Sequence, residues 1–310
     1  MPNNTWFTPY RFPAWKCLSH GPSQGIVYEL SETTVVKVPF QYPVSRAVPL
    51  DEANEQIYMS LQSFALFNKE RAFYDVLAKN PHPNLAQRLQ CKQLSGIVLQ
   101  RFQSLDQAWS LNTKEIHVIW IQQLLSALEW LENLGYTHGD LKVHNMGIDE
   151  NNRLRLFDFG SVRHRDDEGF YEQVLKDHFA LATCIHFLAS GVDPLAKANS
   201  IAELRRTFSI LKGGQGVVEE AARDFEGVIQ AGWMGVHRPA ASFSQLRKAI
   251  ASISGQINVN GAHQNDKSCP SLQLACDDLV VEKDTRWMDE EDYRAACKAD
   301  GFETLDNIWD

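Results

Sequence analysis

The sequence predicts an α+β chain in which the strands fall mainly in the first third and the remainder is mainly helical. Residues 33–38 are rich in β-branched side chains and residues 96–102 form a short apolar run, both of which are typical of strands. Longer stretches at 68–77, 112–131 and 177–188 carry apolar residues at helical spacing or almost all round. With 310 residues and 44% hydrophobic content, the chain can bury a large core in two domain-sized parts.

The most informative stretch runs from His138 to Gly160. It places an acid at Asp140, an amide five residues later at Asn145 and a second acid thirteen residues beyond that at Asp158. Phosphoryl transfer from Mg-ATP depends mainly on positioning and electrostatics, so it needs one carboxylate to orient the acceptor hydroxyl and further oxygen ligands to hold magnesium. The three side chains fit these requirements.

The string His-Gly-Asp-Leu-Lys-Val-His-Asn and the later Asp-Phe-Gly resemble the catalytic and metal-binding loops of the eukaryotic protein kinase superfamily. The resemblance implies a two-lobed kinase-like fold that binds Mg-ATP between a small β-rich N-lobe and a large helical C-lobe. It implies that Asp140 is the catalytic base and that Asn145 and Asp158 bind Mg2+. Lys142 resembles the lysine of Ser/Thr-directed kinases, which stabilises the transferring phosphate.

Upstream, Lys37 lies among β-branched residues and resembles the small-lobe lysine that contacts the α- and β-phosphates of ATP. Gly21, Gly25 and Val27 precede it at the place of the phosphate-covering loop. Glycines suit such a loop because, without a Cβ, they let the backbone approach the phosphates. The match to the family's glycine pattern is partial, since other residues stand at two of its glycine places. A plain hairpin turn is the alternative for these glycines.

Glu70 falls on the flank of the predicted helix at 68–77 and resembles the glutamate that pairs with the strand lysine. More residues than usual separate it from Lys37, so residues 41–60 are expected to be an insertion. Glu55, in an acidic patch of that insertion, is the alternative partner, and Glu70 could also be an ordinary surface charge.

The strand at 96–102 resembles the kinase hinge, whose backbone hydrogen-bonds the adenine edge. Leu99 would then be the gatekeeper, with Gln100 and Phe102 beside it. Asn112, with Glu115 three residues later, predicts the start of the long helix that precedes the catalytic loop.

Asp177 opens the predicted apolar helix, and the matching aspartate in kinases hydrogen-bonds the backbone of the catalytic loop. An ordinary N-cap is the alternative reading. The stretch from Gly232 to Phe243 resembles the Trp and Arg-Pro signature near the end of the large lobe. The resemblance therefore spans about residues 16–252.

Two departures from the kinase pattern stand out. Gly139 replaces the arginine that receives an activation-loop phosphate in most protein kinases. Only residues 161–176 separate the metal loop from the apolar helix, and no Ala-Pro-Glu motif appears. We therefore expect a reduced peptide-positioning platform, which leaves Arg238 without its usual glutamate partner.

These observations predict four parts: an N-terminal extension at 1–15, a kinase N-lobe at 16–103, a kinase C-lobe at 104–253, and a linker with an acidic aromatic tail at 254–310. From residue 255 onward there are 13 acidic against 5 basic residues, compared with 26 against 25 before it. With no basic stripe, nucleic-acid binding is not expected. No membrane span or signal peptide is evident, and six scattered cysteines favour a cytoplasmic or nuclear setting.

The tail predicts a short amphipathic helix from Trp287 to Lys298 that ends at Gly301. A disordered acidic extension is the alternative. Its aromatic residues are expected to dock onto the large lobe, or residues 284–310 to bind a protein partner, since solvated tails are usually poor in aromatics. The acidic aromatic tail also resembles kinase-like proteins of filamentous fungi; its aromatic residues are Trp287, Tyr293, Phe302 and Trp309.

Three functions follow from the resemblance. A Ser/Thr protein kinase that uses ATP and Mg2+ is the first. A small-molecule kinase of the aminoglycoside or choline type, acting on a hydroxyl acceptor, is the second, because its loop also contains His-Gly-Asp and it has no activation segment. A nucleotide-binding pseudokinase that acts as an interaction module is the third, since the glycine loop is degenerate. Lys142 and Asp177 favour the first.

Overall fold

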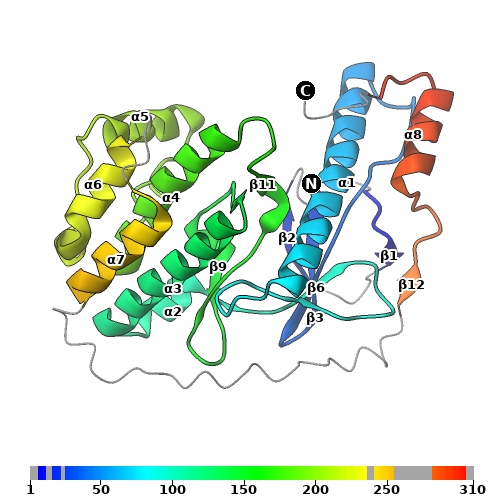
Figure 1. Ribbon diagram of the computed structural model, residues 1–310. Helices are drawn as coiled ribbons and strands as arrows, with labels where there is room; N and C mark the ends of the chain where they lie inside the picture. The colour runs from blue at the N-terminus through cyan, green and yellow to red at the C-terminus, as the bar shows by residue number, and fades with distance from the viewer. Residues whose placement is uncertain (1–5, 12–15, 22–24, 236–240, 255–280, 305–310) are drawn as a thin grey trace. The chain divides into compact units, whose positions relative to one another are not determined.

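The computed structural model describes residues 6–11, 16–21, 25–235, 241–254 and 281–304. Helices and strands both contribute to these ranges (Figure 1), which is compatible with the predicted α+β class. None of the helices within the described ranges combines the length and apolarity that a bilayer crossing requires.

The chain divides into two compact units. The first comprises residues 1–79, 87–101 and 269–310, and the second comprises residues 80–86 and 102–268. Because the first unit draws on both ends of the chain, its core depends on contacts between residues far apart in the sequence.

The first unit contains a five-stranded antiparallel sheet in the order β2-β3-β4-β6-β5. β4 lies at its centre and is rich in β-branched residues, which suit a pleated surface buried on both sides. The strands are β2 (Cys17–Gly21), β3 (Gly25–Ser31), β4 (Thr34–Val38), β5 (Arg88–Leu89) and β6 (Ile97–Gln100).

One helix, α1 (Leu50–Lys79), follows the sheet's third strand and is 30 residues long. Its first turn carries Asp51 and Glu52, whose charges are favourable beside the positive end of the helix dipole. Residues from Leu50 onward form the first turns of this helix, so the second half of the expected insertion at 41–60 is helical and continuous with the segment that carries Glu70. Buried residues continue at helical spacing through those turns, from Ala53 onward.

The C-terminal segment also belongs to the first unit. Strand β12 (Glu282–Lys283) pairs antiparallel with β1 (Tyr10–Arg11), and α8 (Glu290–Ala299) lies beside α1 (Figure 1). The Asp289 carboxylate caps α8 by accepting a 2.9 Å hydrogen bond from the Asp292 N–H.

The predicted tail helix is present, but its aromatic residues pack on α1 and not on the large lobe. Tyr293 and Phe302 join the buried face of α1, and Trp287 packs against the same cluster. Gly301 ends the helix with φ = 76°, a conformation that glycine adopts without strain. Trp309 and the predicted linker lie outside the described residues.

The second unit is mainly helical, with two small sheets. Strands β10, β9 and β7 form one sheet, and β11 pairs with β8 in the other. The helices are α2 (Leu105–Ser110), α3 (Lys114–Asn133), α4 (Phe170–Ser190), α5 (Ile201–Lys212), α6 (Glu226–Met234) and α7 (Phe243–Ser254). The strands are β7 (Gln103–Ser104), β8 (Tyr136–Thr137), β9 (Met146–Ile148), β10 (Leu154–Leu156) and β11 (Arg163–His164).

Two helices begin at other residues than predicted. The N-cap of α3 is Thr113 and not Asn112, because the Asn112 side chain instead donates to the Ala108 carbonyl and accepts from Asn152. Helix α4 begins seven residues before Asp177, which places that residue inside the helix and not at its first turn.

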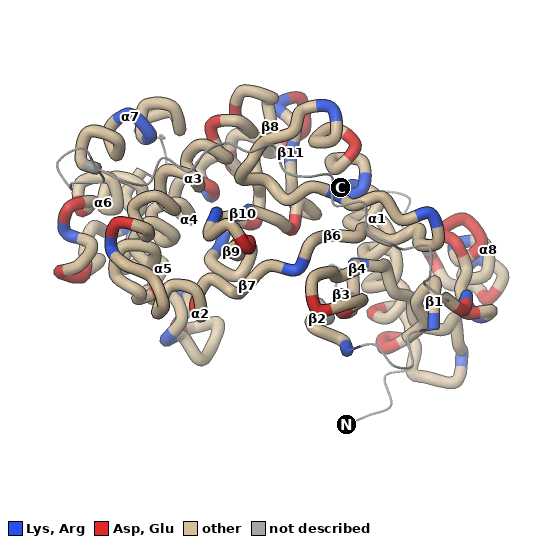
Figure 2. The backbone as a smooth tube through the Cα atoms, turned by 90° about the horizontal axis from the view of Figure 1, so that it is seen from below, with Lys and Arg blue, Asp and Glu red and all other residues tan. Residues whose placement is uncertain are grey.

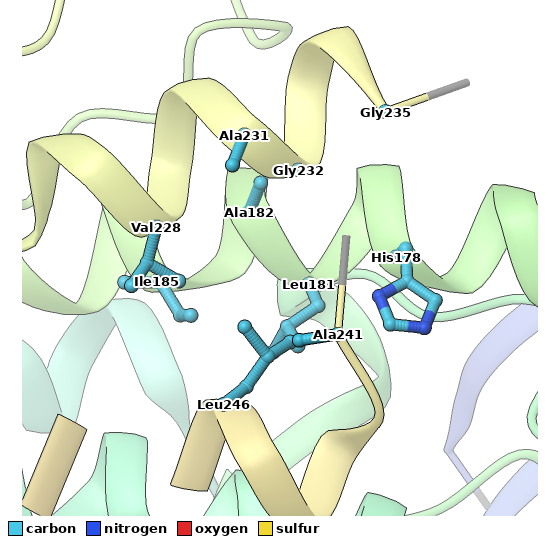
Figure 3. Close-up of a pocket in the computed structure, with 10 residues that line it drawn as sticks. All are labelled: His178, Leu181, Ala182, Ile185, Val228, Ala231, Gly232, Gly235, Ala241 and Leu246. Carbon is cyan, nitrogen blue, oxygen red and sulfur yellow. The ribbon is translucent and has the colours of Figure 1, made fainter. Parts of the chain in front are cut away.

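Helices α4, α6 and α7 enclose a cavity of about 20 Å³, lined mainly by apolar side chains (Figure 3). This volume holds about one water molecule, so the cavity is a packing gap and not a ligand site. α6 and α4 approach closely at Gly232, where an added Cβ would lie 2.6 Å from the Cβ of Ala182.

Candidate active site

In the first unit, Lys37 on β4 forms an ion pair with Glu70 on α1. The Lys37 Nζ lies 2.6 Å from the Glu70 Oε2, and the two side chains are only 9% and 1% exposed. Glu55, the alternative partner, is exposed. Removing one member of a buried ion pair strongly destabilises the folded protein, because the other charge is left buried and uncompensated. The structure therefore selects Glu70 as the lysine's partner.

The glycines before β4 stand in a hairpin. Gly21 pairs with Gly25 across β2 and β3, and residues 22–24 between them lie outside the described residues. Gly25 has φ = 93°, and a Cβ there would lie 2.7 Å from the Val38 carbonyl oxygen. Strand packing alone therefore requires this glycine. Val27 pairs directly with Lys37.

The residues of the predicted hinge fall in both units. Leu99 is buried on β6 opposite Val35, and Gln100 ends the strand. Phe102 belongs to the second unit, where its ring stacks on Phe157 with 5.8 Å between centroids.

In the second unit, a 3-10 turn, η1 (Val143–Asn145), folds the catalytic-loop sequence back on itself. The amide nitrogen of Asn145 donates to the Asp140 carbonyl at 2.7 Å and to its carboxylate at 3.1 Å. Lys142 Nζ contacts the same carboxylate at 2.6 Å. Asp140, Lys142 and Asn145 thus form one cluster, and Asp140 remains partly exposed to solvent.

His138 connects this cluster to the Asp-Phe-Gly segment. Its Nε2 lies 3.1 Å from the Phe157 carbonyl oxygen, and its Nδ1 accepts a 3.3 Å hydrogen bond from the Asp140 N–H. The ring packs against Phe159 at 5.4 Å. Burial lowers the pKa of His138, so the neutral ring, with its proton on Nε2, serves as a structural link between the two loops.

Asp158 lies next to this link in a left-handed backbone conformation, with φ = 66° and ψ = 70°. A non-glycine residue in this region is uncommon and is often found at functional sites, although Asp and Asn tolerate it best. The Phe157 N–H donates to the Asn145 carbonyl at 3.0 Å. This backbone bond holds together the two loops that carry the predicted magnesium ligands.

The backbone geometry at position 139 explains why a glycine stands where most protein kinases carry an arginine. Its φ is 84°, and a Cβ at this position would collide with the carbonyl oxygen of Ser161. Ser161 ends the 3-10 turn η2 (Phe159–Ser161), which contains the Phe-Gly of the metal loop. The side chain of an arginine therefore cannot be accommodated while the two loops remain this close.

Helix α4 fixes the catalytic loop from the other side. The Asp177 carboxylate accepts hydrogen bonds from the backbone N–H groups of His138 at 2.7 Å and Gly139 at 3.0 Å. This is the contact that the kinase resemblance implies for Asp177, so the ordinary N-cap reading is not needed. Burial raises the pKa of Asp177 to about 7, against the opposing effect of the two N–H donors.

Gln173 is a site residue that the sequence analysis missed. Its amide nitrogen donates a 2.7 Å hydrogen bond to the Gly139 carbonyl, and it is buried one helical turn before Asp177. Positions i and i+4 share a helix face, so a glutamine four residues before a buried aspartate could have indicated this role. Arg238, left without its usual partner in the sequence, lies outside the described residues.

Within the described ranges, no group of three or more His, Cys, Asp or Glu side chains is arranged to hold a metal ion. Mg2+ usually keeps several waters and takes only one or two protein carboxylates beside substrate phosphates. Asp158 and Asn145 are compatible with this pattern, because the Asn145 amide nitrogen is used by Asp140 and its oxygen is the atom left to bind a cation.

No protein-family model matches the chain. Short segments match protein kinases. The hormonally up-regulated neu tumor-associated kinase of Homo sapiens is 49% identical over 41 residues, which are 13% of this chain and 6% of that protein. Mitogen-activated protein kinase 14 of Xenopus laevis is 40% identical over 48 residues, 16% of this chain and 13% of the relative.

Maternal embryonic leucine zipper kinase of Danio rerio is 45% identical over 42 residues, 14% of this chain and 6% of the relative. The chain therefore covers only a small part of the kinases it matches. These segments suggest a kinase-like relationship.

Proposed function

We propose that this protein is an ATP-dependent phosphotransferase of the protein kinase type. The observation that carries the proposal is the hydrogen-bonded cluster of Asp140, Lys142 and Asn145, joined to Asp158 through the Asn145–Phe157 backbone bond. The buried Lys37–Glu70 pair and the short matches to kinases support it.

The residues fit Mg-ATP. Asp158 and Asn145 would hold Mg2+ through a carboxylate and an amide oxygen, and Lys37 would contact the phosphates. Bound Mg-ATP would supply the transferable γ-phosphoryl group and neutralise its charge. Glu70 holds the Lys37 ammonium in place by the 2.6 Å ion pair.

Asp140 is the proposed catalytic base, because its partly exposed carboxylate is oriented by Lys142 and Asn145. It would align the acceptor hydroxyl and accept its proton. Lys142, already beside that carboxylate, would stabilise the transferring phosphate.

The adenine and phosphate contacts are further proposals. Leu99 would be the gatekeeper, with backbone groups of Gln100 and Phe102 at the adenine edge. Gly25 would let the β2–β3 hairpin approach the phosphates, with Gly21 and Val27 beside it. The proposal assigns all of these residues and the catalytic cluster to one nucleotide, in a two-lobed kinase-like fold.

A protein Ser or Thr hydroxyl is the preferred acceptor, because Lys142, two residues after Asp140 and in contact with its carboxylate, resembles the lysine of Ser/Thr-directed kinases. A small-molecule kinase is the second candidate. The observation that favours it is the early start of α4, which leaves only residues 162–169 between η2 and the helix.

Transfer of labelled γ-phosphate by purified protein tests the proposal. The acceptors are the protein itself, generic basic and acidic proteins, and a panel of small alcohols, with Asp140→Asn as the matched control. We expect Mg2+-dependent transfer that Asp140→Asn slows by about 100-fold or more. Binding of nucleotide without transfer to any acceptor would favour the pseudokinase alternative, and absence of binding would contradict the proposal.

A further inference from the structure

The N-terminal half of α1 depends on the C-terminal segment for its burial. The Phe64 ring lies 5.3 Å from the Trp287 ring and 5.9 Å from the Tyr293 ring, between centroids. Tyr293 and Cys297 of α8 are fully buried in this contact. Phe64 is six residues before Glu70, so the tail covers the helix within two turns of the ion pair.

A serine in α1 also binds the tail directly. The Ser60 hydroxyl donates to the Gln56 carbonyl at 2.8 Å and accepts from the Tyr42 N–H at 2.9 Å. The Tyr293 hydroxyl donates to the same oxygen at 3.2 Å. Both lone pairs and the proton of the serine are thereby used. Tyr42 is five residues after Lys37, so this hydroxyl joins the tail, the helix of Glu70 and the segment that leaves the lysine's strand.

The tail makes a second contact with the segment that follows the strand of Lys37. The side chain of Gln41 is buried and donates through Nε2 to the Arg286 carbonyl at 3.3 Å. Its backbone pairs with Phe7, over whose ring the Arg286 guanidinium lies at 4.1 Å. The tail therefore contacts α1, which carries Glu70, and the segment that directly follows the strand of Lys37.

We propose that residues 281–304 act as a built-in positioning element for the Lys37–Glu70 pair, with Tyr293 as the central positioning residue. Lys37 and Glu70 lie on different elements, and a 2.6 Å ion pair persists only while those elements stay in register. Tyr293 contributes in two ways, through its ring against Phe64 and through its hydroxyl on Ser60. The consequence for nucleotide binding rests on the proposed function, whereas the positioning itself does not.

The test compares three variants of the full chain. Tyr293→Ala removes ring and hydroxyl, Tyr293→Phe removes only the hydroxyl, and Lys298→Ala changes an exposed residue of the same helix as the matched control. Amide exchange is measured at residues 37–42 and 60–72, and affinity for a non-hydrolysable ATP analogue is measured well below the melting temperature. A coupling of ordinary size predicts about 10-fold weaker binding for Tyr293→Ala.

We expect faster exchange at both segments in Tyr293→Ala, a smaller effect in Tyr293→Phe and none in Lys298→Ala. Glu70→Gln provides the decisive background, because a tail that acts through the ion pair has little left to influence once the pair is lost. There, Tyr293→Ala should change affinity by less than about 2-fold.

Equal losses of affinity in the wild-type and Glu70→Gln backgrounds would overturn the proposal. So would a lowered melting temperature with unchanged exchange at residues 37–42 and 60–72. If the wild-type protein binds no nucleotide, the proposed function fails, and the exchange measurements still decide whether the tail positions the pair.

Discussion

The Gln173 side chain donates a 2.7 Å hydrogen bond to the Gly139 carbonyl, and so ties the catalytic loop to helix α4. Asp177, on the same helix face, binds the N–H of Gly139. The N–H and the carbonyl of Gly139 are thus both held by side chains of α4. A phosphate received by an arginine is the usual means of ordering this region in kinases, and here the order comes from buried hydrogen bonds to Gln173 and Asp177.

We therefore predict that activity does not require phosphorylation within residues 161–176, which run from the metal loop into α4. Protein treated with phosphatase should transfer phosphate as fast as untreated protein. The hydroxyls available there are Ser161 and the exposed Tyr171. A large loss of activity that returns on rephosphorylation of either residue would show that the segment is regulated after all.

Asp140→Asn should reduce turnover by about 100-fold or more while leaving nucleotide affinity nearly unchanged, because the amide keeps the shape but cannot accept a proton. Single-turnover transfer and calorimetric binding separate the two effects. A variant that turns over at the wild-type rate would exclude Asp140 as the base.

Asp158→Asn is the sharper test of the metal site, because asparagine tolerates the left-handed backbone that Asp158 adopts. The variant should fold normally and lose most of the Mg2+ dependence of nucleotide binding, since the charged ligand is removed. Calorimetry with and without Mg2+ measures this. Identical affinities under both conditions in the wild type would mean that Asp158 is not a metal ligand.

Gly139→Ala should impair the site without touching a proposed catalytic side chain. The added methyl group meets the Ser161 carbonyl in a left-handed conformation, which costs about 1–3 kcal/mol where the backbone cannot relax. Melting temperature and turnover should both fall. Gly227→Ala, on a helix where an added Cβ meets no atom within 4 Å, is the matched control and should leave both unchanged.

The contribution of His178 to the stability of the second unit should decrease on mild acidification. His178 is buried and stacks on Phe243 with 4.5 Å between ring centroids, and burial lowers its pKa to about 4. The His178 imidazole binds a proton near pH 6.5 in the unfolded chain but not in the folded one. Its contribution to stability is therefore complete above that pH and falls towards pH 4. Between pH 7.5 and 5 this residue accounts for about 2 kcal/mol.

His178→Phe keeps the ring stack and removes the titration, so its free energy of unfolding should fall by less over the same range. Denaturant unfolding of both proteins at the two pH values measures the difference. Asp177, whose pKa is raised to about 7, acts in the opposite direction and cancels in the comparison. Equal losses in the two proteins would show that the imidazole is not kept neutral in the fold.

Local sequence patterns were sufficient for much of the candidate site. The resemblance paired Lys37 with Glu70 and directed Asp177 to the catalytic loop, and both contacts are present. Each of these residues lies in a short motif, and such a motif stays recognisable when the length of chain between two motifs changes. The roles of these residues in catalysis stay predictions.

The missed features depend on packing between distant parts of the chain. The sequence predicts the apolar face of α8, but it does not predict the surface on which that face packs, because any long apolar stripe offers similar burial. The first turns of α1, within the stretch expected to be an insertion, provide that stripe. Gln173 was missed because a glutamine in an amphipathic helix is usually solvent-facing, and only the path of the loop reveals its partner.

The pairing of β1 with β12 bears on how the protein is made. Tyr10 faces Lys283 across that ladder, so the first unit is completed only after the second has been synthesised. Until then, the part of α1 that later contacts α8 has no cover from the tail, and contacts this distant in sequence form slowly. During translation, an early intermediate with an uncovered apolar helix is therefore expected, and truncation of the chain shortly before residue 281 would make that intermediate permanent.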